Sequence, residues 1–144
     1  MNAFCLHDYD GLVGQKGFQA GPYVHLPKEE FIMEDCIFCK IMAGEIPTTK
    51  IYEDELCFAF KDIEPLAPTH FLVIPKQHVA SAAEIGPEME PVIGHIYGVI
   101  AKLSHEMGFS EGFRVVTNCG ADAGQTVHHL HFHVLAGKQL GSFN

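Results

Sequence analysis

Residues 128–135 constrain the fold most, because imidazole and apolar side chains alternate along this segment. Such alternation is typical of a β-strand that has two unlike faces. His129, His131 and His133 are expected to share one face of this strand. The other face is expected to enter the hydrophobic core with the remaining side chains, which are Leu130, Phe132, Val134 and, on the same side, His128.

The spacing of the three histidines tests whether they bind one metal ion. Alternate residues of a strand lie about 6.6 Å apart, so His129 and His133 are separated by roughly 13 Å. With a zinc–nitrogen bond of about 2.1 Å, three such rings hardly converge on one ion, although two neighbouring rings can share one. The spacing favours a phosphate group, which His131 attacks in line while His133 donates a hydrogen bond to one of its oxygens. A catalytic metal on His129 and His131 stays open as an alternative.

Packing alone is a weak explanation for the histidine face. Burying three imidazoles without partners would cost about 1–3 kcal/mol for each unsatisfied nitrogen. The preceding loop also supplies groups that suit phosphate oxygens, namely the backbone N–H groups around Gly120 and Gly124 and the hydroxyl of Thr126. The loop and the histidines together predict an anion site.

Apolar periodicity places the histidine segment in an α+β domain. Apolar residues recur at helical spacing between Pro87 and Gly108, which predicts one long helix lying on a sheet. A short helix is expected over residues 36–43. The five expected strands cover residues 50–53, 56–61, 70–74, 113–117 and 128–135. The expected fold is a mainly antiparallel five-stranded sheet with one long and one short helix.

The composition predicts one domain that binds small ligands. The chain has 144 residues and a formal net charge of −9, so it offers no basic surface for nucleic acid or anionic lipid. No apolar run approaches the roughly 20 residues that span a bilayer, and the five scattered cysteines are unlike a secreted disulfide framework. We therefore expect a cytoplasmic protein. Residues 1–32 are expected to form a poorly structured extension to a domain over residues 33–144.

Several separated motifs, in addition to the histidines, resemble one protein family. They are Asp-Cys-Ile-Phe-Cys-Lys-Ile at residues 35–41, Phe-Lys-Asp-Ile at 60–63, the segment 67–76, and Gly-Gln-Thr-Val at 124–127. Together they resemble the histidine-triad (HIT) nucleotide-binding family over about residues 34–140, and within it the Hint branch of nucleoside phosphoramidases. The resemblance implies a HIT-like fold whose sheets join in a homodimer through the long helix and an adjacent strand.

The resemblance also implies an activity for His131. In the family, the counterpart of this residue accepts the nucleoside monophosphate as a covalent intermediate, which water then hydrolyses. The implied substrates are purine nucleoside 5′-phosphoramidates and related adenylylated compounds, and the chemical step uses no metal. The implied catalytic residues are His131, His133, His129, His70 and Thr126.

The resemblance assigns further residues to nucleotide binding. Asp62 is expected to hold the ribose hydroxyls. The base is expected in an apolar slot formed by Phe38, Ile41, Phe60, Ile63 and Leu72, and the positions near the phosphate and leaving group are Asn118, Gly124, Gln125 and Val127. Two alternatives stay open: a dinucleoside polyphosphate hydrolase or nucleotidyl transferase of the same family, and a non-catalytic nucleotide-binding dimer. Thr126 stands where the branch commonly has serine.

A separate site is indicated by Cys36 and Cys39. The spacing of this pair allows two thiolates to reach one zinc ion, or the two cysteines are ordinary reduced thiols or a redox pair. Zinc-carrying HIT proteins add the histidine after the Pro-Lys segment and the first triad histidine, which match His78 and His129. The resemblance therefore implies a structural zinc, which would fasten the first helix to the histidine strand.

Overall fold

The computed structural model describes residues 35–142. The α-helices and strands, in chain order, are α1 (Ile37–Met42), β1 (Lys50–Glu53), β2 (Cys57–Lys61), β3 (Thr69–Pro75), α2 (Glu90–Glu106), β4 (Phe113–Val116) and β5 (Phe132–Ala136), with short 3-10 helices at Ala82–Glu84 and Ala121–Ala123. No helix in this part of the chain is both long and apolar enough to cross a membrane. The extension expected over residues 1–32 lies outside the described residues.

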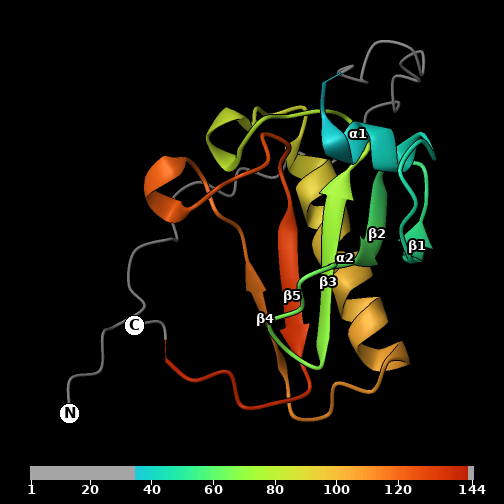
Figure 1. Cartoon of the computed structure of the whole chain (residues 1–144), viewed down its shortest axis with the longest axis vertical. Helices are drawn as coiled ribbons and strands as arrows, with labels where there is room; N and C mark the ends of the chain where they lie inside the picture. The colour runs from blue at the N-terminus through green and yellow to red at the C-terminus, as the bar shows by residue number, and fades with distance from the viewer. Residues whose placement is uncertain (1–34, 143–144) are drawn as a thin grey trace, which may run out of the picture.

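The five strands form one antiparallel sheet (Figure 1). Their order is β1-β2-β3-β5-β4, so the last strand of the chain lies between β3 and β4. In Figure 1 the helix α2 lies behind the sheet, and α1 lies near the end of β3. The predicted α+β architecture is confirmed, whereas the joining of two sheets in a homodimer stays a prediction.

The long helix covers one face of the sheet because its apolar residues recur at helical spacing. The buried stripe consists of Val92, Ile96, Val99, Ile100 and Leu103, and it packs in one core with residues of β2, β3 and β5. Each fully buried apolar side chain contributes about 1.5–3 kcal/mol, so this stripe holds the helix on the sheet. Gly108 follows the helix with a φ of 72°, a left-handed conformation that favours glycine.

The opposite face of the sheet carries a smaller apolar cluster. Along β2, Phe58 and Phe60 belong to this cluster, whereas their neighbours Cys57 and Ala59 belong to the core under α2. Successive side chains of a strand point to opposite faces, so the two clusters lie on the two sides of the sheet. Phe38 of α1 completes the smaller cluster. The three histidines, predicted on the face opposite the core residues, are therefore expected on the α1 side of the sheet.

The turn between β1 and β2 is fastened to α2 by Asp54. One carboxylate oxygen accepts the N–H groups of Leu56 and Cys57 at 2.8 and 2.9 Å. The other accepts the Tyr52 hydroxyl at 2.9 Å and Nε2–H of His95, from α2, at 2.6 Å. Burial acts to raise the pKa of Asp54, but the hydrogen bonds from His95 and the backbone outweigh it and hold this pKa well below its usual range.

The strand predicted over residues 128–135 is wrong in its first half, because β5 begins only at Phe132. Val73 of β3 pairs with Phe132, so Pro75 would face Leu130 if the ladder continued. Pro75 has no N–H to donate, and the N–H of Leu130 instead bonds to the carbonyl of Val79 at 2.6 Å. Residues 128–131 therefore follow an irregular path.

Because of this irregular path, the prediction of which side chains in residues 128–134 enter the core is confirmed only in part. Leu130, Phe132 and Val134 lie in the core under α2, as expected. His128 was expected on the same side, and that expectation is wrong, because its side chain is exposed. Without a strand at this position, alternation no longer dictates the side to which residue 128 turns.

Candidate functional site

His131 is held by a hydrogen bond to the main chain. Its Nδ1 lies 2.6 Å from the carbonyl oxygen of His129. Since a carbonyl oxygen only accepts, Nδ1 carries the proton and Nε2 of the neutral ring has a free lone pair. The ring edge meets Phe38, with centroids 5.2 Å apart, so His131 faces the α1 side of the sheet. The Thr117 hydroxyl fixes the backbone by donating to the His131 carbonyl at 2.6 Å.

The Nε2 atom of His131 is accessible although the residue is only 6% exposed. Within residues 35–142, every fully buried side-chain nitrogen or oxygen has a hydrogen-bond partner. Nε2 of His131 has no such partner among these residues, so this atom reaches the surface. A nitrogen lone pair at an accessible position is what a nucleophilic histidine needs.

His133 is held in the opposite tautomer by a relay of two hydrogen bonds. The N–H of Leu66 donates to Nδ1 of His70 at 3.1 Å, so Nε2 of His70 carries that ring's proton. This N–H donates to Nδ1 of His133 at 2.9 Å, which leaves the proton of His133 on Nε2. The rings of His131 and His133 have centroids 5.1 Å apart. A lone pair and an N–H donor are therefore presented side by side.

Burial keeps both rings of the relay neutral. Burial, together with the neighbouring rings of His131 and His70, lowers the pKa of His133 to about 4, against the pull of Asp62. Burial likewise lowers the pKa of His70, again opposed by Asp62. The Asp62 carboxylate lies 3.4 Å from Nε2 of His70 and 3.9 Å from Nδ1 of His133. The neutral rings agree with the tautomers that the hydrogen bonds fix.

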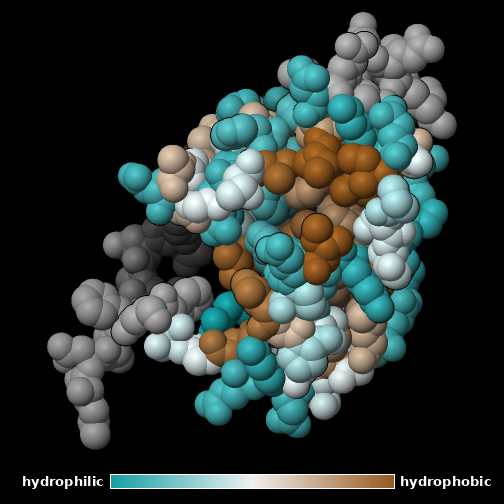
Figure 2. All heavy atoms as spheres, in the orientation of Figure 1, coloured by the Kyte–Doolittle hydropathy of each residue, from teal (hydrophilic) through white to brown (hydrophobic). Residues whose placement is uncertain are grey.

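The apolar residues expected to bind a base are brought together with one exception. Phe38, Phe60 and Leu72 share the smaller cluster, with Ile41 and Val127 packed against it. Ile63 does not join them, because it is 91% exposed. Figure 2 shows apolar side chains gathered on the face of the molecule that carries α1.

Ile63 lies instead at an open hollow beside Asp62. The hollow has a volume of about 500 Å³, and its lining consists of Pro47, Thr48, Thr49, Lys61, Asp62 and Ile63. Asp62 belongs both to this hollow and to the neighbourhood of His70. The hollow therefore adjoins the histidines through the carboxylate that is expected to hold a ribose.

The loop before the histidines is braced by the side chain of Gln125. Its Oε1 accepts the N–H of Gly120 at 2.9 Å, and its Nε2 donates to the carbonyls of Ala80 and Val127 at 2.7 and 3.0 Å. Gly120 and Gly124 have φ values of 81° and 75°, which favour glycine. The Gln125 amide thus fixes the shape of the loop.

Thr126 and Asn118 lie on the same loop with polar groups to spare. Thr126 is exposed and Asn118 is half-buried, and neither side chain bonds to another residue between 35 and 142. Two supporting groups were missed from the sequence, namely the Thr117 hydroxyl and the N–H of Leu66. A backbone N–H carries no sequence signal, and Thr117 looks like any β-branched residue at the end of a strand.

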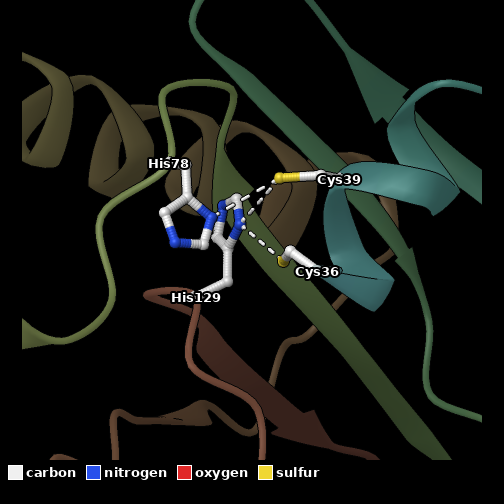
Figure 3. A group of neighbouring side chains, drawn as sticks. All are labelled: Cys36, Cys39, His78 and His129. Atoms are coloured by element: carbon white, nitrogen blue, oxygen red, sulfur yellow. Dashed lines mark hydrogen bonds between the residues drawn. The ribbon is translucent and has the colours of Figure 1, made fainter. Parts of the chain in front are cut away.

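Cys36, Cys39, His78 and His129 come together beside the triad (Figure 3). Nδ1 of His129 lies 3.5 Å from Sγ of Cys36 and 3.6 Å from Sγ of Cys39, and Nδ1 of His78 lies 3.5 Å from Sγ of Cys39. Tetrahedral zinc, with bonds of about 2.3 Å to sulfur and about 2.05 Å to nitrogen, places such atoms about 3.6 Å apart. These three separations match those of a tetrahedral zinc site, and all four ligand atoms lie within 4.8 Å of one another.

The tautomer and the charge of His129 suit metal binding. Its Nε2–H donates to the carbonyl of Pro75 at 2.9 Å, which leaves the lone pair of Nδ1 facing the sulfurs. Burial lowers the pKa of His129 to about 4, although the bond to Pro75 opposes the shift, and burial also lowers the pKa of His78.

The alternative of a metal ion shared by His129 and His131 lacks a third ligand. Among the described residues, His131 belongs to no cluster of three or more side chains that could hold a metal ion.

Comparison with known proteins agrees with this geometry. The HIT domain family matches residues 43–140. A histidine triad protein from Clostridium difficile is 51% identical, with a TM-score of 0.75, covering 78% of this chain and 98% of that one. A HIT family hydrolase from Legionella pneumophila Philadelphia 1 is 42% identical, with a TM-score of 0.72, covering 74% and 96%. The purine nucleoside phosphoramidase of Escherichia coli strain K12 is 40% identical over 75% of this chain and 92% of its own length. The chain therefore belongs to the HIT domain family, which includes hydrolases and nucleotide-binding proteins.

Proposed function

We propose that the protein hydrolyses purine nucleoside 5′-phosphoramidates and related adenylylated compounds through a nucleotide bound covalently to His131. The observation that carries this proposal is the hydrogen bond from Nδ1 of His131 to the His129 carbonyl, which leaves the Nε2 lone pair next to the N–H donor of His133. The name of the Escherichia coli relative, purine nucleoside phosphoramidase, supports the same activity.

The proposed chemistry has two steps. Nε2 of His131 attacks phosphorus, so that a nitrogen–phosphorus bond forms while the bond to the leaving nitrogen breaks. The leaving nitrogen takes up a proton and departs as an amine, with the exposed Thr126 hydroxyl available to assist it. Water then attacks phosphorus, gives up a proton and releases the nucleoside monophosphate from His131. In both steps Nε2–H of His133 donates to a non-bridging oxygen and stabilises its charge.

The nucleoside is proposed to lie between the triad and the hollow at Asp62. The Asp62 carboxylate would accept hydrogen bonds from the ribose hydroxyls. The base would contact the apolar slot of Phe38, Ile41, Phe60 and Leu72, with Ile63 at its mouth. Close to the phosphate would lie the loop groups of Asn118, Gly124, Gln125, Val127 and Thr126.

We propose a structural zinc ion on Cys36, Cys39, His78 and His129. The donor set of two sulfurs and two nitrogens, at separations that match a tetrahedral site, supports this assignment. When bound, the ion would join α1 to the segment before β5. It has no proposed part in the chemical step, and metal analysis of the purified protein tests its presence.

We also propose a homodimer, located in the cytoplasm. β4 is an edge strand, and a Cβ added at Gly94 or Gly98 of α2 would meet nothing within 4 Å, so both elements have room for a second copy. Phe113 is 41% exposed at this edge. None of the cysteines among residues 35–142 forms a disulfide, which agrees with a reducing compartment. Analytical ultracentrifugation tests the dimer.

A substrate panel tests the proposed activity. Wild type and His131→Ala are supplied with adenosine 5′-phosphoramidate and with a dinucleoside polyphosphate, and products are separated by chromatography. We expect release of AMP from the phosphoramidate by wild type alone. Preferred cleavage of the polyphosphate would favour the other branch of the family. Nucleotide binding without turnover of either compound would contradict the enzymatic proposal and favour a non-catalytic dimer.

A further inference from the structure

His129 belongs to two sites at once. Its imidazole Nδ1 faces the sulfurs of Cys36 and Cys39 (Figure 3). Its carbonyl oxygen, in the same residue, accepts Nδ1–H of His131. The side chain of His129 is therefore tied to the proposed zinc site, while its main chain holds the proposed nucleophile.

We propose that His129 is a positioning residue, which transmits occupancy of the cluster Cys36–Cys39–His78–His129 to the orientation and tautomer of His131. The inference rests on the proposed function only in calling His131 the nucleophile. The geometric part, that the cluster fixes the proton of His131 on Nδ1, stands without any assumption about the substrate.

The backbone around His129 has little else to hold it in place. Residues 128–131 lie outside β5, so no ladder of sheet hydrogen bonds fixes the His129 carbonyl. The next residue, Leu130, is anchored by its N–H to Val79. The ring of His129 is held by Pro75 on one side and faces the thiols on the other. Loss of the ligand bond would leave this ring with the Pro75 contact and with the weaker hydrogen bonds between Nδ1 and the two thiols.

A second contact connects the cluster to His131. Phe38 lies between the two cysteines in the sequence, and its ring meets the rings of both His131 and His129, with centroids 5.2 and 6.0 Å away. A zinc ion on Cys36 and Cys39 would hold the first turn of α1, and with it the ring that packs against His131. The carbonyl and the Phe38 ring thus act on the same imidazole from two directions.

The tautomer of His131 is the property that this coupling controls. With Nδ1–H donating to the carbonyl, the lone pair lies on Nε2, the accessible nitrogen. If the carbonyl moves away, a neutral imidazole no longer has a fixed tautomer, and the form that carries its proton on Nε2 has no lone pair to attack phosphorus.

The test reads the tautomer of His131 directly. Protein labelled with ¹⁵N in histidine is measured by long-range ¹H–¹⁵N correlation in the zinc-loaded state, after removal of zinc with a chelator, and after reloading. We expect a protonated Nδ1 and an unprotonated Nε2 for His131 in the loaded protein. In the metal-free protein we expect averaged shifts of both nitrogens, with recovery on reloading. Unchanged His131 shifts in protein shown to be metal-free would overturn the proposal, as would a failure to bind zinc.

A kinetic measurement accompanies the spectra. The single-turnover rate of nucleotide transfer to His131 is expected to fall about tenfold or more on zinc removal, a typical effect of losing a supporting contact. Turnover that is absent even from the loaded protein would refute the proposed function alone, because the tautomer shift would still be measurable. A normal rate in the metal-free protein would count against the coupling.

Two variants separate the coupling from general loosening of the fold. His78→Ala removes one ligand but leaves the Pro75 bond and both cysteines, and should show the His131 changes even if complete stripping unfolds the chain. His95→Ala removes the hydrogen bond to Asp54 between α2 and the first hairpin, away from the cluster. It should lower the melting temperature without moving the His131 shifts. Equal changes of the His131 shifts in both variants would show that the shifts report a loss of stability and not the proposed coupling.

Discussion

Nδ1 of His131 donates to the carbonyl oxygen of His129 at 2.6 Å, so the proton of one triad ring is held by the main chain of another triad residue. The same residue, His129, turns its own ring toward two cysteines. Three neighbouring histidines thereby have three different tasks. His131 presents a lone pair, His133 presents an N–H group, and His129 supports the first of them.

Replacement of His131 by alanine should abolish turnover while leaving the fold intact. Without Nε2 no covalent intermediate forms, and losing a nucleophile typically costs about 10³-fold or more in kcat. Steady-state kinetics and trapping of the nucleotidyl protein measure the effect. His105→Ala, at the exposed end of α2, is the matched control and should behave as wild type. Residual kcat of His131→Ala above a tenth of the wild-type value would exclude His131 as the nucleophile.

Replacement of His70 should act through the tautomer of His133. His70→Ala removes the donor that keeps the proton of His133 on Nε2, so we expect kcat to fall about tenfold with a smaller change in KM. His70→Gln can accept from Leu66 and donate to His133, and it should recover part of the lost rate. The kcat and KM of the two variants test this expectation. An equal loss of kcat in both variants would contradict a role for the hydrogen-bond relay.

Acidification should destabilise the fold through His133. Burial lowers its folded-state pKa to about 4, below the value of about 6.5 in an unfolded chain. The unfolded chain therefore binds more protons between these values, and stability is lost as the pH falls through 6.5 toward 4. Between pH 7 and pH 5 this histidine alone should lower the free energy of unfolding by about 2 kcal/mol. Urea unfolding of wild type and His133→Gln at both pH values measures it, with the smaller loss expected for the variant.

Removal of the Asp54 carboxylate should destabilise the protein without altering the chemistry. Asp54→Ala leaves the Tyr52 hydroxyl, His95 and two backbone N–H groups without their acceptor, which we expect to cost about 2–3 kcal/mol at pH 7. Because the pKa of this carboxyl is held below its ordinary value, its contribution is present above the unfolded pKa and disappears as the pH falls through the folded pKa. Thermal unfolding as a function of pH should show the two proteins converging in acid. The folded Asp54→Ala variant should have the same kcat as wild type.

The sequence predicted most where spacing alone determines structure. The apolar stripe of α2 and the alternation within β5 both depend on local periodicity, and the structure contains both. The four cluster residues followed from motif positions, and the chain folds so that they meet.

The missed features depend on contacts between distant residues. The start of β5 is set by Pro75, far away in the chain, because a partner without an N–H ends the ladder. The exposure of Ile63 and the brace formed by Gln125 depend on loop paths that periodicity does not describe. The Leu66 amide that fixes His70 has no side-chain signature at all.

The late start of β5 has a consequence for where reactivity can arise. In a regular sheet the main-chain oxygens of an inner strand accept hydrogen bonds from the neighbouring strands, so none is left to orient a side chain. Because β5 begins only at Phe132, the His129 carbonyl belongs to no ladder and accepts Nδ1–H of His131 instead. The reactive imidazole thus occurs where backbone pairing stops, at the junction of a rigid frame and an unpaired stretch of chain.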